Sequence, residues 1–390
     1  MKFRKPLAIA VAATTILSGA SHAVTVGKIN ETTVTLGGFI KLDAISTDYS
    51  DGTAAAGSIG RDFYVPSTTP VGGESENRVF DMHARQTRFN LGTLTELDGH
   101  KLKTFIELDF MATPNGDERI SNSYTPRLRH AFLQYDNWLM GQTWSTFQNV
   151  GSLPETVDFI GNTDFGIFVR QAQIRYTAGG FQFAVENPET TITPFGGGGR
   201  IVADDNMLPD FIARYNLKAG GLDMAFAGLA RELSYNTEGS GGNIDSSTTS
   251  FGLSITGKYT FPNKSDLRFG VNTGSGMGRY IGLNVANGAV LDADGELEAI
   301  DSTAAYIAYR HMWNAKWRSN VTYSAIEIDN DTDLTGMGVT SSTSSVRVNL
   351  FYSPVPALSF GGEVAVANRE LESEVDGSMT RLQFTAKLGF

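Results

Sequence analysis

Basic side chains recur at every second position in several stretches of this 390-residue sequence. The last stretch is the clearest, because Arg381, Gln383, Thr385 and Lys387 alternate with Leu382, Phe384, Ala386, Leu388 and Phe390. Guanidinium and ammonium groups donate several hydrogen bonds and favour carboxylate and phosphate partners. A row of such groups on one face would attract anions, and this is the chemistry that the spacing suggests.

The same parity assigns eleven basic and five acidic residues to the polar face of their stretches, so that face is basic although the formal net charge is −11. The basic residues are Lys41, Lys103, Arg175, Arg214, Lys258, Arg268, Arg310, Arg318, Arg347, Arg381 and Lys387. The acidic residues are Asp43, Glu107, Asp109, Glu186 and Glu363. Most other acids cluster between the alternating stretches, for example at 292–298, 329–333 and 370–376.

Two stretches do not follow the parity rule. In residues 84–91, Arg88 joins the polar face, whereas Arg85 would point outward, lie beyond a bulge or lie in a subunit interface. In residues 127–132, Leu128 and Phe132 indicate the apolar face, so Arg127 and Arg129 join the polar face. His130 would then point outward, which suggests an interface.

Catalytic and metal-binding patterns are weak. There is no cysteine, and no Gly-x-Ser-x-Gly motif accompanies the histidines. The acidic segments 292–295 and 329–333 are incomplete as calcium loops, so solvated charge or bridging to lipopolysaccharide phosphates through divalent ions is the favoured interpretation. We expect no enzymatic activity, no cofactor and no protein metal site, and the negative charge disfavours a nucleic-acid partner.

The elements that would position the basic residues are strands, since the apolar period is two throughout. Many of the sixteen predicted strands have about ten residues, enough to cross a bilayer when tilted. Their spans are 32–45, 79–96, 100–112, 126–136, 137–147, 168–177, 180–187, 209–218, 222–233, 248–260, 266–275, 301–311, 316–328, 342–352, 358–369 and 379–390.

Short turns and long polar loops alternate between these strands. Tight turns such as Asp98-Gly99 and Gly220-Gly221 follow even-numbered strands, and Trp and Tyr gather beside them. This alternation predicts an all-β fold, a transmembrane antiparallel barrel of 16 strands with short periplasmic turns. A barrel of that size encloses water. Residues 1–23 have the pattern of an export signal cleaved near Ala23, which leaves 24–390 as the barrel domain.

The third long loop, 148–167, contains three glycines and apolar residues such as Phe159 and Phe165, so it should pack against other parts of the chain. It resembles the general porin pattern, in which this loop follows strand five, folds into the barrel and narrows it. Glu155, Asp158 and Asp164 would then face the basic wall and create a transverse field.

A more specific resemblance lies just upstream. The segments 138–147, 85–88 and 127–131 are similar to those of the DcaP-like trimeric porins, and the similarity is sharp over 80–180. It implies a 16-stranded homotrimer with a narrow eyelet that passes small anionic compounds such as dicarboxylates. Members often carry a coiled-coil segment before the barrel, whereas here about ten residues separate Val24 from the first strand.

The sequence therefore predicts a porin of a Gram-negative outer membrane, in contact with its lipid and lipopolysaccharide, for passive diffusion of small polar and especially carboxylated solutes. The pore-lining basic residues would be Lys41, Arg88, Lys103, Arg127, Arg129, Arg175, Arg214, Arg268, Arg310, Arg347 and Arg381. Two alternatives stay open: a non-selective or cation-preferring general porin, and a barrel with an adhesin or receptor role.

Overall fold

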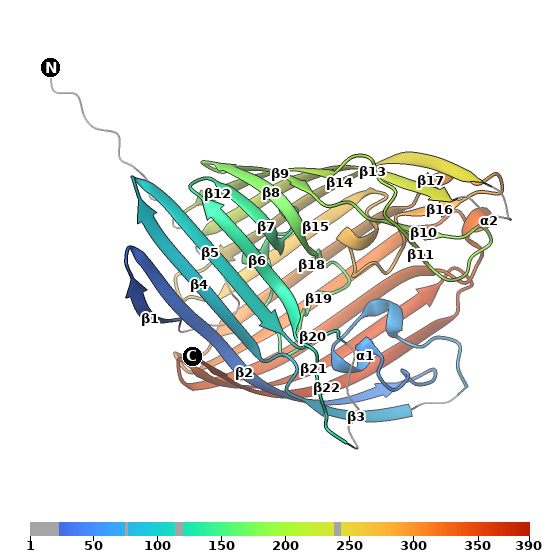
Figure 1. The fold of residues 1–390 in the computed structure, drawn as a ribbon. Helices are drawn as coiled ribbons and strands as arrows, with labels where there is room; N and C mark the ends of the chain where they lie inside the picture. The colour runs from blue at the N-terminus through green and yellow to red at the C-terminus, as the bar shows by residue number, and fades with distance from the viewer. Residues whose placement is uncertain (1–22, 75–76, 114–119, 238–242) are drawn as a thin grey trace.

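The structure is a computed structural model that describes residues 23–74, 77–113, 120–237 and 243–390. Its main sheet closes on itself because β2 (Thr32–Tyr49) pairs with β22 (Asp376–Gly389). β3 (Asn77–His83) and β4 (Arg88–Leu97) pair with one edge of β2 and form a single wall strand with a break. The predicted fold is confirmed: the chain forms a closed antiparallel barrel of 16 strands (Figure 1).

The other wall strands follow in chain order, and each pairs with its neighbour. They are β5 (His100–Asp109), β6 (Arg127–Tyr135), β7 (Trp138–Trp144), β8 (Arg170–Ala178), β9 (Phe181–Glu186), β12 (Asp210–Ala219), β13 (Leu222–Thr237), β14 (Ile244–Thr260), β15 (Asp266–Ser275), β18 (Asp301–Met312), β19 (Trp317–Asp329), β20 (Thr340–Val355) and β21 (Leu358–Leu371). A short strand, β1 (Val24–Ile29), extends the sheet beside the start of β2. The predicted export signal lies outside the described residues, apart from Ala23.

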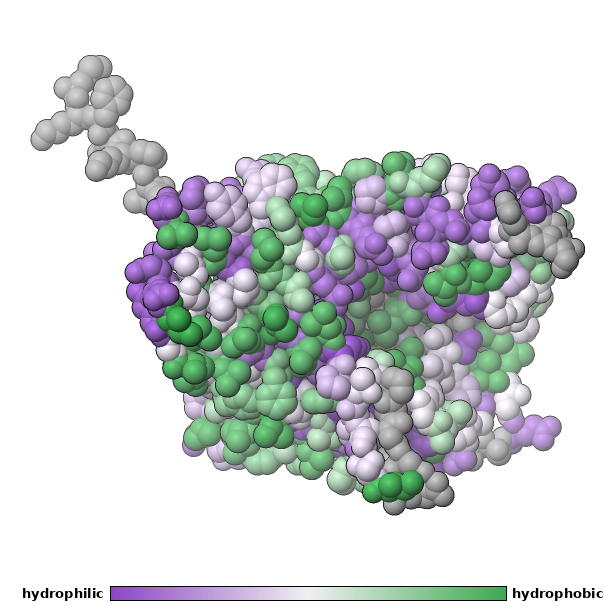
Figure 2. Space-filling model, viewed as in Figure 1, coloured by the Kyte–Doolittle hydropathy of each residue, from purple (hydrophilic) through white to green (hydrophobic). Residues whose placement is uncertain are grey.

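Burial alternates along the wall strands in the sense opposite to that of a soluble protein. On β22, Leu382 and Phe384 are 58% and 51% exposed, whereas Arg381 and Gln383 are 1% and 4% exposed. Apolar side chains therefore point outward and polar ones inward, as a barrel surrounded by lipid requires. Figure 2 shows hydrophobic side chains gathered on the outer surface over β4 to β6. Among the described residues, no helix has the length and apolar character needed to cross a membrane.

The two ends of the barrel differ. At one end the strands are joined by tight turns, such as Asp98-Gly99, where both residues have positive φ. Large aromatic side chains, among them Trp138, Trp313 and Trp317, are exposed beside these turns. β1 and the C-terminal end of β22 lie at this same end (Figure 1). At the other end most connections are long, although only the four residues 372–375 join β21 to β22.

Several long connections are folded rather than freely solvated, which the alternation of strands did not predict. Residues 50–74 contain α1 (Ile59–Asp62) and η1 (Pro66–Thr68), residues 145–169 contain η2 (Val150–Ser152), and residues 276–300 contain η3 (Gly278–Tyr280). A separate four-stranded sheet joins two long connections; its strands are β10 (Thr190–Thr193), β11 (Ile201–Ala203), β16 (Ala289–Leu291) and β17 (Leu297–Ala299). Apolar side chains such as Ile192, Leu233 and Leu291 pack beneath this sheet.

The acidic segment 329–333 also has a local explanation. Asp331 caps the single-turn helix α2 (Thr332–Thr335), and its side chain accepts a hydrogen bond from the backbone N–H of Asp333. Asp292 similarly accepts from the backbone N–H groups of Asp294 and Glu296. These carboxylates therefore fix loop geometry.

The two stretches that break the parity rule are irregular in the structure. His130 does not point outward, and that expectation is wrong: it is 4% exposed, and its Nδ1 lies 2.9 Å from Thr143 Oγ1. A bulge opposite Glu107 and Leu108 turns the side chains of both Arg129 and His130 inward. After the bulge the inward and outward positions of β6 are exchanged, so Leu133 is more exposed than Phe132. Arg85 lies in the break between β3 and β4, where it is 3% exposed and pairs with Asp62.

Candidate functional site

The connection 145–169, called the inner loop below, lies inside the barrel. It joins β7 to β8 and is hydrogen-bonded to five other wall strands, namely the neighbouring β14, β15 and β18, and β20 and β2 further around the barrel. The bonds are Lys41 Nζ to Val157 O (2.9 Å), Asn149 Nδ2 to Thr256 Oγ1 (3.0 Å), Asn272 Nδ2 to Phe165 O (3.1 Å), Tyr306 Oη to Ser152 O (2.6 Å) and Asn349 Nδ2 to Glu155 O (3.0 Å). A loop that touches opposite walls must cross the lumen and narrow it.

Two carboxylates hold the loop in this path. Glu363 of β21 accepts hydrogen bonds from the backbone N–H groups of Val157 (2.9 Å) and Asp158 (3.4 Å). The Asp158 carboxylate accepts from Ile160 and Gly161 within the loop and from Tyr64 in the first long connection. The chain can turn at this point because Gly161 has a φ of +96°, which favours glycine. Asp158 thus joins two inward-folded connections.

Glu155 is the acidic residue most exposed to the lumen among the three predicted ones. Its carboxylate accepts from Arg318 Nε and Nη2, with N–O distances of 2.6–2.9 Å, and lies 3.8 Å from Arg310 Nη1. Burial raises the pKa of Glu155, but the hydrogen bonds and charges of Arg318, Arg310 and Arg268 outweigh it, so the pKa is lowered from 4.5. Glu155 is therefore ionised near neutral pH.

A second group of basic residues lies on the adjacent wall and shares two acids. Arg127 and Arg129 bind Asp109 at 2.9 and 3.0 Å, and Arg129 also binds Glu107 at 2.8 Å. Arg88 lies 3.5 Å from Glu107. Four arginines, counting Arg170 with Arg88, Arg127 and Arg129, thus face two carboxylates, and the group carries surplus positive charge.

Aromatic rings cover the flat faces of these guanidinium groups. The Arg170 guanidinium lies 4.4 Å from the Trp144 ring centroid and 5.2 Å from that of Phe168, and Arg129 lies 5.7 Å from both Trp144 and Phe159. Stacking restricts the guanidinium planes and leaves their N–H edges for hydrogen bonds. Arg170 was not predicted, because it lies on the outward parity of β8, and only its position next to the inner loop brings it to this group.

A cavity of about 170 Å³ lies between the inner loop and these walls. Its charged lining consists of five cations, Lys41, Arg88, Arg129, Arg318 and Lys387, and two carboxylates, Glu155 and Asp158. Pro356 and Ala357, in the short turn between β20 and β21, also line it, so it opens toward the short-turn end. The narrow part of the barrel therefore has a positive lining.

Four of the predicted basic residues serve mainly to hold the inward-folded connections. Arg347 and Arg381, each 1% exposed, lie 3.9 and 3.8 Å from Asp158, and Arg381 also donates to Gly60 O in the first connection. Arg214 donates to Gln148 O at 2.5 Å. Arg268 likewise donates to Leu153 O and binds Asp266, which Arg310 also binds. Lys103 and Arg175 lie on β5 and β8, away from the cavity lining.

Asp164, the third predicted acid, has no exposed surface. Its carboxylate accepts hydrogen bonds from four hydroxyl groups, those of Tyr64, Ser324, Thr343 and Ser345, at 2.5–2.7 Å. Burial and the neighbouring carboxylate raise the pKa of the Tyr64 hydroxyl well above 10.0. Asp164 therefore ties the inner loop to the first connection and to β19 and β20, and it does not line the cavity.

An antiparallel barrel of 16 strands, apolar outside and charged inside, with a loop folded across its lumen, has the architecture of an outer-membrane porin. The family model described as "DcaP outer membrane protein" matches residues 23–390, and the chain belongs to this family. The protein is thus a channel-forming protein of the outer membrane.

Solved structures show the same fold. The outer membrane channel DcaP of Acinetobacter baumannii is 21% identical, with a TM-score of 0.76 over 96% of this chain and 100% of that one. OmpT of Vibrio cholerae is 12% identical (TM-score 0.55, 93% and 99% covered), and Salmonella typhi OmpF is 12% identical (TM-score 0.53, 91% and 98% covered). A comparison with curated protein sequences gives no match.

Proposed function

We propose that this porin conducts small polar solutes by passive diffusion and favours anions, carboxylated compounds in particular. The observation that carries the proposal is the lining of the cavity under the inner loop, where five cations face two carboxylates. In a narrow channel with walls of low dielectric constant, a surplus of fixed positive charge raises the local concentration of anions.

The arrangement of the donors also suits carboxylates. Arginine binds a carboxylate through two parallel N–H groups, and Arg88, which lines the cavity and lies 3.5 Å from Glu107 and 4.0 Å from Asp109, would offer such an edge to a solute. Glu155 lines the same cavity as Arg88, so the field across the cavity would orient a solute that carries both a charge and a dipole.

The resemblance to trimeric porins supports a second proposal, that the chain assembles as a homotrimer in contact with outer-membrane lipid and lipopolysaccharide. A trimer should migrate on a semi-native gel as a heat-modifiable band of about three times the chain mass. A band of monomer size in mild detergent would contradict this.

The deciding measurement for selectivity is the reversal potential of the purified protein in a planar bilayer under a salt gradient. A potential that indicates anion preference supports the proposal. A cation preference would mean that the acids of the long loops, and not the wall arginines, set the field. Absence of conductance would favour an adhesin or receptor role.

A further inference from the structure

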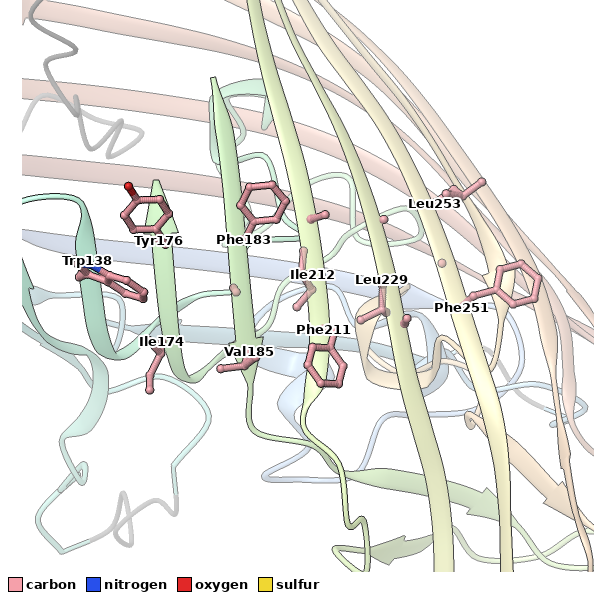
Figure 3. Close-up of a pocket in the computed structure, with 15 residues that line it drawn as sticks. Trp138, Ile174, Tyr176, Phe183, Val185, Phe211, Ile212, Leu229, Phe251 and Leu253 are labelled. Carbon is pink, nitrogen blue, oxygen red and sulfur yellow. The ribbon is translucent and has the colours of Figure 1, made fainter. Parts of the chain in front are cut away.

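A groove with an apolar lining lies on the outer face of the barrel over β7 to β14, and the barrel wall separates it from the lumen (Figure 3). Its volume is about 640 Å³, comparable to that of pockets that hold small ligands. None of its lining residues is charged, and Phe183, Phe211 and Phe251 are each about half exposed. A surface of this composition is suited to hydrocarbon.

Small residues form the floor of the groove. Ala213 on β12 pairs with Gly228 on β13, and Ala230 lies two positions further along β13. Their strand neighbours are large: Phe183 pairs with Ala213, and Phe251 pairs with Ala230. Side chains at these paired positions project from the same face of the sheet, so the small residues form a valley and the larger side chains beside them form its ridges.

The groove also has a direction. One register row runs across six strands through Trp138, Tyr176, Phe183, Ala213, Gly228 and Leu253. Trp138 is the first residue of β7, next to a short turn, whereas Leu253 lies seven residues from the short-turn end of β14. Because barrel strands are tilted, this row climbs from the short-turn rim toward the middle of the membrane. Five strand spacings of about 4.8 Å give it a length of about 24 Å.

We infer that this groove binds one acyl chain of a phospholipid from the periplasmic leaflet. Trp138 and Tyr176, whose ring centroids are 4.7 Å apart, lie at its lower end, where such side chains favour the membrane–water boundary and where a headgroup would be. From there the acyl chain would extend over the small residues Ala213 and Gly228 toward the middle of the membrane. The lipid would dock against the outer wall opposite the part of the inner loop that contacts β12 and β14.

The test fills the valley without touching the lumen. A Cβ at Gly228 would meet nothing within 4 Å, so Gly228→Leu can be accommodated by the barrel and would occupy the groove. Gly362 on β21 is a matched control, because it is also on the outer face and its Cβ would also meet nothing within 4 Å. Native mass spectrometry of detergent-purified protein, followed by extraction and quantification of phospholipid, gives the amount retained per chain.

We expect the native protein and Gly362→Leu to retain one phospholipid per chain and Gly228→Leu to retain none, with conductance and heat-modifiable migration unchanged in all three. Equal retention in the two variants would overturn the proposal. A weaker oligomer in Gly228→Leu at unchanged lipid content would also overturn it, because a second copy of the chain would then occupy the groove. Ala213→Leu, which fills the same valley from β12, serves if Gly228→Leu does not fold.

Discussion

Exchange of a single charge in the cavity should change ion selectivity several-fold, with opposite signs for the two partners of the Glu155–Arg318 pair. The five cations and two carboxylates of the lining give a net charge of +3. Glu155→Gln raises it to +4, and Arg318→Gln lowers it to +2. At a distance of about 7 Å and in a water-like dielectric, one unit charge changes the energy of a monovalent ion by about 0.6 kcal/mol.

Anions and cations respond with opposite sign, so the ratio of their permeabilities changes by about 1.2 kcal/mol, or about sevenfold. We expect Glu155→Gln to increase the anion preference by this factor and Arg318→Gln to reduce it by the same factor. The assay is the reversal potential under a tenfold salt gradient, repeated at low and high salt, since screening at about 1 M should nearly abolish the difference. If the reversal potentials of both variants shifted in the same direction, or if the shifts did not depend on salt, the argument from the cavity charges would be refuted.

Other predictions concern the inner loop. Asp164→Asn removes acceptor capacity from a cluster of four donating hydroxyl groups, and each lost bond to a charged group costs about 1.5–3 kcal/mol, so heat-modifiable migration should begin at a lower temperature and current noise should increase. Gly361→Val should reduce conductance, because its Cβ would lie 2.6 Å from the Phe351 ring and 2.9 Å from Val157 Cγ2, which would displace the ring and the inner loop. Anion preference should stay constant as the pH falls from 7 to 5 and rise only below 4.5, where Glu155, whose pKa is lowered, loses its charge.

The fold could be predicted because each wall strand carries the same simple pattern. One side of the sheet meets lipid and the other meets water, so apolar and polar residues alternate wherever the strand is regular. Where the backbone is irregular, the rule fails for a local reason. The bulge at Arg129 and His130 places two successive side chains inside, and no periodic pattern contains this information.

The site was less predictable, because it depends on which loops fold inward. Parity identifies Arg318 and Lys387 as polar-face residues, but it cannot tell that Glu155 meets Arg318 from a position 163 residues away along the chain. Phe159 and Phe165 did indicate that the inner loop packs against something. The apolar residues of the 276–300 connection, such as Met277 and Ile281, are an equivalent sign, since both are completely buried.

Selectivity in this barrel should therefore depend on a few unbalanced charges rather than on the number of basic residues in the wall. Arg347 and Arg381 are nearly inaccessible and lie beside Asp158, so their charge is largely used in holding the loop. Arg127 and Arg129 are paired with Asp109. Charges paired at about 3 Å, such as those of Glu155 and Arg318, nearly cancel at the distance of a permeating solute, so an ion meets the remaining charge near Arg88 and Lys387.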